Sequence, residues 1–172
     1  MLNADRKFRT IIAILLFFQV STAHTATLIY PEYEAQKVVF EFYFDHPNKI
    51  ATALYWVRSL LNSLTEAPYS HAPDDIDIKI VIHGTEIVTF AKNNYAKYTD
   101  IVERARYYAA LGVEFRVCAY AAQDFGYQAD DLYDFVKLVP SAITDLAHWQ
   151  LKGYALIVPK VWEKQFTTEE IR

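Results

Sequence analysis

Cys118, the only cysteine of the 172-residue chain, is the residue whose type and position point most directly to chemistry. It closes the β-type run 113–118, and the small residues Ala119, Ala121 and Ala122 that follow it can open a helix. A thiol at the carboxyl end of a strand lies where open α/β sheets place their ligands, and a helix N-terminus beside it favours the thiolate. The alternative is a buried structural cysteine, because free cysteines are among the most buried residues.

His83 is the second candidate, because it stands at the end of another apolar run, 76–83, and is followed by Gly84. An imidazole close to a thiol either stabilises the thiolate or removes its proton. Spacing does not give the order of the strands in the sheet. His83 is therefore a candidate thiolate partner of Cys118, and the alternative is a histidine that ends a strand and bonds to the backbone.

Other chemistries find little support in the residue pattern. No two of the five histidines stand at i, i+4 and there is no second cysteine, so we expect no metal site. The four glycines form neither a phosphate-binding loop nor a dinucleotide fingerprint, and no G-x-S-x-G is present, so we expect no cofactor. A thiol-dependent hydrolase would lack an orienting partner beyond His83. The absence of Cys-x-x-Cys excludes a self-contained redox dithiol.

Strands and helices alternate along the chain. We expect strands at 37–44, 76–83, 113–118, 135–139 and 154–158. Helices are expected at 47–64 and 119–126 and from an N-cap at Ser141 to Lys152. A further long helix is expected around 98–109, with Gly112 capping its end. This order predicts a three-layer α/β/α domain with a five-stranded, mainly parallel sheet. The carboxyl edge of that sheet would collect Cys118, His83 and a further set of residues: Asp45, His46, Pro140 and Ser141.

The first 23 residues have the pattern of a secretory signal peptide. Three basic residues precede the apolar run 10–20, and Ser21-Thr22-Ala23 offers a cleavage site after Ala23. The run is short for a bilayer-spanning anchor. We therefore expect a periplasmic or secreted protein without stable membrane insertion. An irregular lead-in at 24–36, a domain at 37–160 and a tail at 161–172 would follow.

The charge of the remaining chain restricts its partners. Residues 1–23 hold three basic residues and one acidic residue, so 14 basic and 20 acidic residues remain, a formal net charge of −6. Such a surface disfavours nucleic acid and anionic membranes as partners. The 13 tyrosines are typical of a subunit interface as well as of a core.

Four blocks, in order, resemble the DsrE/DsrF family of sulfur-relay proteins over roughly residues 37–160. The cysteine block is Gly112-Val113-x-Phe115-x-Val117-Cys118-Ala119-x-Ala121-Ala122-x-x-x-Gly126. The others are Val81-Ile82-His83-Gly84, Leu138-Val139-Pro140-Ser141 and Asp145-Leu146-Ala147-x-x-Gln150-x-Lys152-Gly153-Tyr154-Ala155-x-Ile157-x-Pro159. A departure is Asp124-Phe125-Gly126, where cytoplasmic relay members usually have a basic residue before the glycine.

The resemblance implies a homo-oligomer, a trimer or hexamer, and a strand-end cysteine that carries sulfur as a persulfide. By position that cysteine is Cys118. The expected function is an exported sulfur carrier or sulfurtransferase-like protein in sulfur-compound metabolism, with a donor and an acceptor protein as partners. The alternative is a non-catalytic oligomeric binding module of the same fold, in which Cys118 is structural.

Overall fold

The computed structural model describes residues 25–72 and 75–172. The strands are β1 (Gln36–Phe42), β2 (Ile76–Ile82), β3 (Glu114–Cys118), β4 (Val136–Val139) and β5 (Ala155–Ile157). The α-helices are α1 (Ile50–Thr65), α2 (Tyr95–Ala110), α3 (Ala119–Asp124), α4 (Ala142–Leu151) and α5 (Thr168–Ile171). Short 3-10 helices are η1 (Pro47–Lys49), η3 (Thr85–Phe90), η4 (Lys92–Asn94) and η5 (Ala129–Asp131). Residues 25–30 form a unit separate from residues 31–172 and contain no helix or strand.

The five strands form one parallel sheet in the order β4-β3-β2-β1-β5. The chain adds β2, β3 and β4 on one side of β1, and α4 then returns it so that β5 pairs with the other side of β1. The predicted α/β fold with a five-stranded sheet is therefore confirmed. Every pairing between these five strands is parallel, and an isolated antiparallel bridge joins Ala91 to Leu132 outside the sheet.

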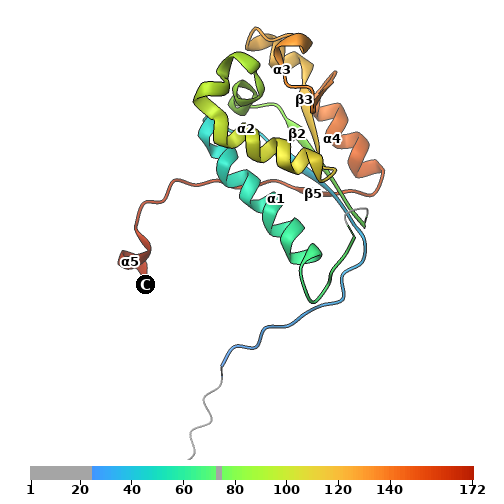
Figure 1. Cartoon of the computed structure of the whole chain (residues 1–172), viewed down its shortest axis with the longest axis vertical. Helices are drawn as coiled ribbons and strands as arrows, with labels where there is room; N and C mark the ends of the chain where they lie inside the picture. Colours follow the sequence, from blue (N-terminus) through green and yellow to red (C-terminus); the bar gives the residue numbers. More distant parts are fainter. Residues whose placement is uncertain (1–24, 73–74) are drawn as a thin grey trace, which may run out of the picture. The chain divides into compact units, whose positions relative to one another are not determined.

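Helices cover both faces of the sheet, with α1 and α2 on one face and α4 on the other (Figure 1). Side chains alternate between the faces of a strand, so Phe40 and Phe42 of β1 point to the α1 side while Val39 points to the α4 side. The α1 side holds the larger apolar core. The α4 side holds a smaller cluster in which Cys118 and Val81 pack under the helix.

Three strands end before the predicted residue, one of them β5, which was expected to reach residue 158 and ends at Ile157. The strand predicted at 37–44 ends at Phe42, and the strand predicted at 76–83 ends at Ile82. Hydrogen bonds between the two segments nevertheless continue past the strand ends: His83 N–H donates to the Phe42 carbonyl at 3.1 Å and Thr85 N–H to the Phe44 carbonyl at 3.0 Å. Residues 85–94 form the 3-10 helices η3 and η4, with Ala91 between them.

Ser141 occupies the N-cap of α4 as predicted, but its hydroxyl makes no capping bond. Its carbonyl instead accepts the first helical bond from Asp145 N–H at 3.0 Å. The predicted signal peptide, residues 1–23, lies outside the described residues. Within the ranges described, no helix is long and apolar enough to cross a bilayer.

Candidate functional site

Cys118 is the last residue of β3 and is nearly buried, with 6% of its surface exposed. Its neighbours in the cluster on the α4 side include Val39 and Val81 from the sheet and Ala142 and Leu146 from α4. The helix that follows it, α3, is six residues long. The thiol lies at the carboxyl end of a strand, as predicted. That strand, β3, is interior to the sheet, and the first turns of α4 cover the thiol.

His83 and Cys118 lie on neighbouring strands. Ile82, the last residue of β2, pairs with Val117 of β3. His83 therefore follows β2 directly beside Cys118, the last residue of β3, and alternation puts both on the α4 face. The imidazole Nε2 lies 3.0 Å from the Glu41 Oε1, and its ring stacks on Tyr43 with centroids 4.6 Å apart. Within residues 25–72 and 75–172, no hydrogen bond joins His83 to Cys118. The structure thus brings the two residues to one edge and gives His83 a carboxylate partner.

A cavity of about 650 Å³ opens at the same edge of the sheet. Its walls come from the ends of β1 and β2, from α3 and from the segment after β5. It includes Tyr43, His83, Ala121, Phe125 and Trp162, and its surface is mostly apolar. Cys118 is not part of the wall, although Ala121 on the following helix turn is. Of the other edge residues predicted from sequence, Asp45 lines the cavity and His46 caps η1 through its Nδ1.

The fully buried carboxylate of Glu86 holds two of the cavity loops together. One oxygen accepts from Gly84 N–H at 2.9 Å and the other from Phe44 N–H at 3.0 Å. Burial raises the pKa of Glu86, because desolvation outweighs the backbone hydrogen bonds that favour the charged form. Gly84 is required here, since a Cβ on it would meet Phe44 N at 2.5 Å.

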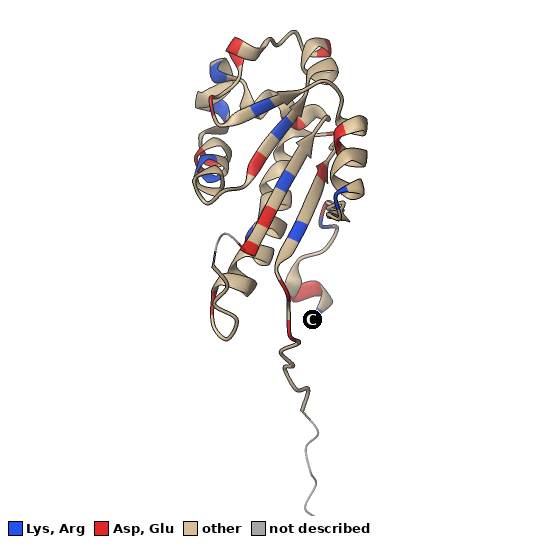
Figure 2. Cartoon of the chain, turned by 90° about the vertical axis from the view of Figure 1, so that its right-hand side faces the viewer, with Lys and Arg blue, Asp and Glu red and all other residues tan. Residues whose placement is uncertain are grey.

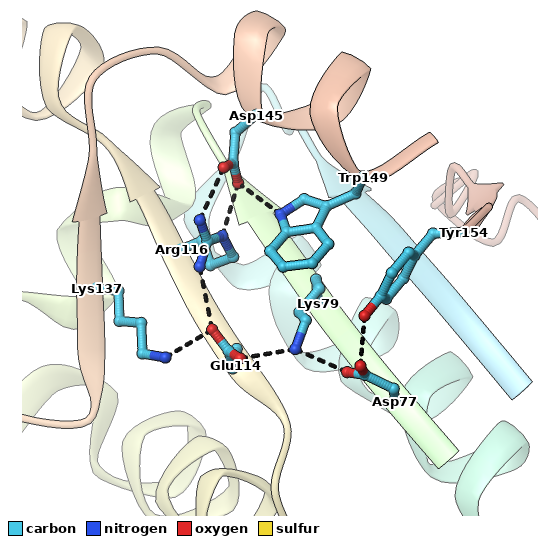
Figure 3. A network of polar contacts seen from close by, with 8 residues as sticks. All are labelled: Asp77, Lys79, Glu114, Arg116, Lys137, Asp145, Trp149 and Tyr154. Carbon is cyan, nitrogen blue, oxygen red and sulfur yellow. Dashed lines mark hydrogen bonds and ion pairs between the residues drawn. The ribbon is translucent and has the colours of Figure 1, made fainter. Parts of the chain in front are cut away.

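The α4 face of the sheet also carries charged residues along its strands (Figure 2). Lys79 of β2, only 6% exposed, donates to Glu114 of β3 at 2.6 Å and lies 2.7 Å from Asp77. Arg116 binds Asp145 of α4 through two bonds, of 2.7 and 2.8 Å (Figure 3). Bidentate charge-assisted bonds of this kind are among the stronger polar contacts in proteins.

Glu114 is the centre of this network. Besides Lys79 it accepts from Arg116 at 3.0 Å and from Lys137 of β4 at 2.7 Å. Burial acts to raise its pKa, but the bonds to Lys137 and Lys79 outweigh burial and lower the pKa to about 2. Hydrogen bonds to Asp77 and Glu114 likewise outweigh burial and raise the pKa of Lys79.

The network reaches α4 and β5 as well. Trp149 of α4 donates its Nε1 proton to Asp145 at 3.2 Å, and Tyr154, just before β5, hydrogen-bonds Asp77 (Figure 3). Lys79 Nζ lies 4.9 Å from the Trp149 ring centroid. The network thus ties three strands to the helix that covers Cys118. Across the described segments of the chain, no three His, Cys, Asp or Glu side chains gather as a metal site would need.

Comparison with known proteins agrees with this arrangement. The sequence model of the DsrE/DsrF-like family matches residues 36–159. The chain belongs to the DsrE/DsrF-like family. No curated protein gives a significant match.

Two solved structures resemble this member of the DsrE/DsrF-like family. The protein of unknown function MTH1491 from Methanobacterium thermoautotrophicum is 22% identical, with a TM-score of 0.58 over 72% of this chain and 99% of its own. The YchN protein from E. coli is 14% identical, with a TM-score of 0.49 over 72% of this chain and 98% of its own. The first likeness supports the α/β fold.

Sequence reasoning missed Glu86 and the charged network. A glutamate two residues after a glycine gives no sign that it will be buried. The network left a clearer signal, because Asp77 and Lys79 alternate along β2 and Glu114 and Arg116 along β3. Two apolar strands with charges of both signs at every second position favour cross-strand ion pairs on one face.

Proposed function

We propose that this DsrE/DsrF-like protein is a sulfur carrier that holds a persulfide on Cys118 during sulfur-compound metabolism. The observation that carries the proposal is the position of Cys118, at the carboxyl end of β3 and one strand away from His83. The same edge of the sheet holds the cavity, and Ala121 of its wall packs against the cluster that contains Cys118.

The proposed reaction moves one sulfur atom without net oxidation. The Cys118 thiolate attacks the outer sulfur of a donor such as thiosulfate, the S–S bond of the donor breaks, and sulfite leaves with the electron pair. The product is Cys118–S–S⁻. An acceptor thiolate then attacks the terminal sulfur and releases the Cys118 thiolate. If the protein repeatedly takes sulfur from the donor and passes it to the acceptor, it would act as a sulfurtransferase. The role of His83, as the partner of the thiol, would be to take the proton of Cys118 through the ring nitrogen that Glu41 does not engage.

The burial of Cys118 favours a second candidate, a binding module in which the cysteine is structural. With 6% of its surface exposed and Leu146 and Ala142 over it, the thiol packs as a small apolar side chain does. The two candidates differ in one measurable respect, the reactivity of Cys118 in the folded protein.

The test is the intact mass of the purified protein after incubation with thiosulfate or polysulfide, with and without reductant. Because Cys118 is the only cysteine, any thiol-borne sulfur must lie on it. If the protein is a carrier, its mass increases by one or more sulfur atoms and the increase is lost on reduction. The Cys118→Ser variant should show no increase. A folded protein that gains no sulfur and whose Cys118 resists alkylation would overturn the carrier and leave the binding module.

We also propose that the protein is exported to the periplasm or secreted and assembles as a trimer or hexamer. The signal-like pattern of residues 1–23 supports export. The mass of the protein isolated from the envelope or medium tests it: cleavage after Ala23 predicts a chain that begins at His24. A protein that keeps residues 1–23 and stays inside the cell would contradict it.

A further inference from the structure

We propose that the cavity at the carboxyl edge of the sheet binds a flat, mostly apolar aromatic molecule that carries a hydrogen-bond donor. The position of the cavity is the first argument. The chain adds strands on one side of β1 up to β4 and then places β5 on the other side, so the order reverses between β1 and β5. Open parallel sheets bind ligands outside the carboxyl ends of the strands at such a reversal. The cavity is lined by Tyr43 after β1 and Trp162 after β5.

Its size and chemistry are those of a small-molecule site. About 650 Å³ falls within the range of about 300–1,000 Å³ typical of ligand pockets. Most of the exposed surface of the cavity is apolar, as in typical ligand pockets. Charged side chains also line it, and two of them, Asp45 and Lys49, pair with each other at 2.7 Å. The Glu86 carboxylate fixes the loops at Phe44 and Gly84, so that this part of the wall is formed before a ligand arrives.

The aromatic residues indicate a planar ligand. Tyr43, Phe125 and Trp162 line the cavity, yet 69%, 41% and 81% of their surfaces remain exposed. Aromatic rings gain about 0.5–1.5 kcal/mol from stacking beyond the area that they bury. A flat ring that enters the cavity would cover these exposed faces, whereas a saturated ring would contact them less closely.

The environment of His83 indicates that the ligand carries a hydrogen-bond donor. When its Nε2–H donates to Glu41, its Nδ1 is left as an acceptor. Within the described ranges, no hydrogen bond reaches Nδ1, and the side chain lines the cavity. A ligand hydroxyl or amine that donates to Nδ1 would satisfy it. This inference concerns the cavity wall, which excludes Cys118, and it stands independently of the persulfide.

The experiment is equilibrium dialysis of the full chain against three matched probes. We expect 2-naphthol, a flat ring with a donor, to bind at one site per chain. We expect 2-methoxynaphthalene, which has the ring but no donor, to bind about fivefold to tenfold more weakly, as the loss of one hydrogen bond predicts. Decahydro-2-naphthol, which has the donor but no flat ring, should also bind more weakly. Absence of saturable 2-naphthol binding would overturn the proposal.

Variants locate the site. Phe125→Ala or Trp162→Ala should weaken 2-naphthol binding severalfold, whereas Trp56→Ala on α1, outside the cavity, should leave it unchanged. His83→Phe keeps an aromatic ring and should abolish the preference for 2-naphthol over its methyl ether. Equal weakening by Trp56→Ala would contradict the assignment.

Two further measurements test the binding site without relying on whether the cavity variants fold or on whether Cys118 carries sulfur. In the wild-type protein, the imidazole resonances of His83 should shift on titration with 2-naphthol, and unshifted resonances at saturation would overturn the proposal. Cys118→Ser should bind 2-naphthol as the wild type does, even if the persulfide is never observed.

Discussion

At the scale of single residues, Glu86 joins two loops through one buried carboxylate. Glu86→Gln keeps the shape but leaves one oxygen in place of two, and its amide NH₂ then faces a backbone N–H. An unsatisfied buried donor costs about 1–3 kcal/mol, so we expect the free energy of unfolding to fall by about that amount. Urea titration followed by circular dichroism measures it. The matched control is Glu66→Gln at an exposed position, which should change little.

The pairing of Glu114 predicts how the free energy of unfolding depends on pH. Its folded pKa, about 2, lies below the ordinary value of 4.5, so the carboxylate contributes stability that is present above about pH 4.5 and lost as the pH falls toward 2. Urea midpoints measured at pH 5 and pH 3 should therefore differ less in Glu114→Gln than in the wild type. A wild type and variant with parallel pH dependence would show that the pairing with Lys79 and Lys137 does not shift the pKa.

At the scale of elements, α4 lies over Cys118 and is tied to β3 by Asp145 and Arg116. Asp145→Asn breaks the bidentate pair and leaves the guanidinium of Arg116, 15% exposed, with Glu114 on β3 as its remaining carboxylate. Because that carboxylate does not hold α4, the helix should open more often. We expect alkylation of Cys118 by iodoacetamide in the folded protein to become about tenfold faster. Asp134→Asn removes an exposed pair with Arg106 and should leave the rate unchanged. Equal rates in all three proteins would show that α4 does not control access.

The elements themselves were largely predictable from sequence, and the contacts between them were not. Apolar runs such as 113–118 predict strands because burial on both faces requires them. The strand-end position of Cys118 followed from that pattern. Whether it was buried depended on α4, whose placement over β1, β2 and β3 comes from the strand order. The partner of His83 likewise depended on the register of β1 against β2, which brings Glu41 beside it.

At the scale of the whole molecule, the edges of the sheet bear on assembly. Leu138 on β4 and Leu156 on β5 are each 40% exposed, and apolar edge strands are surfaces on which another chain can pack. Light scattering of the purified protein should give three or six times the mass of one chain. Leu138→Glu or Leu156→Glu should lower that mass if its edge lies in the interface. A wild type that is monomeric at every concentration tested would refute the trimer or hexamer.

The place of β5 beside β1 bears on how the protein is made. β1 is synthesised before the other strands and can pair on one of its sides only after β5 has been made, because Val38, Val39 and Phe40 pair with residues 155–157. A nascent chain that has not yet reached residues 155–157 therefore presents one side of β1 without a partner. The sheet is complete only once residues 155–157 have been made, so a shortened chain that ends before Ala155 would have β1 as the exposed edge strand of a four-stranded sheet.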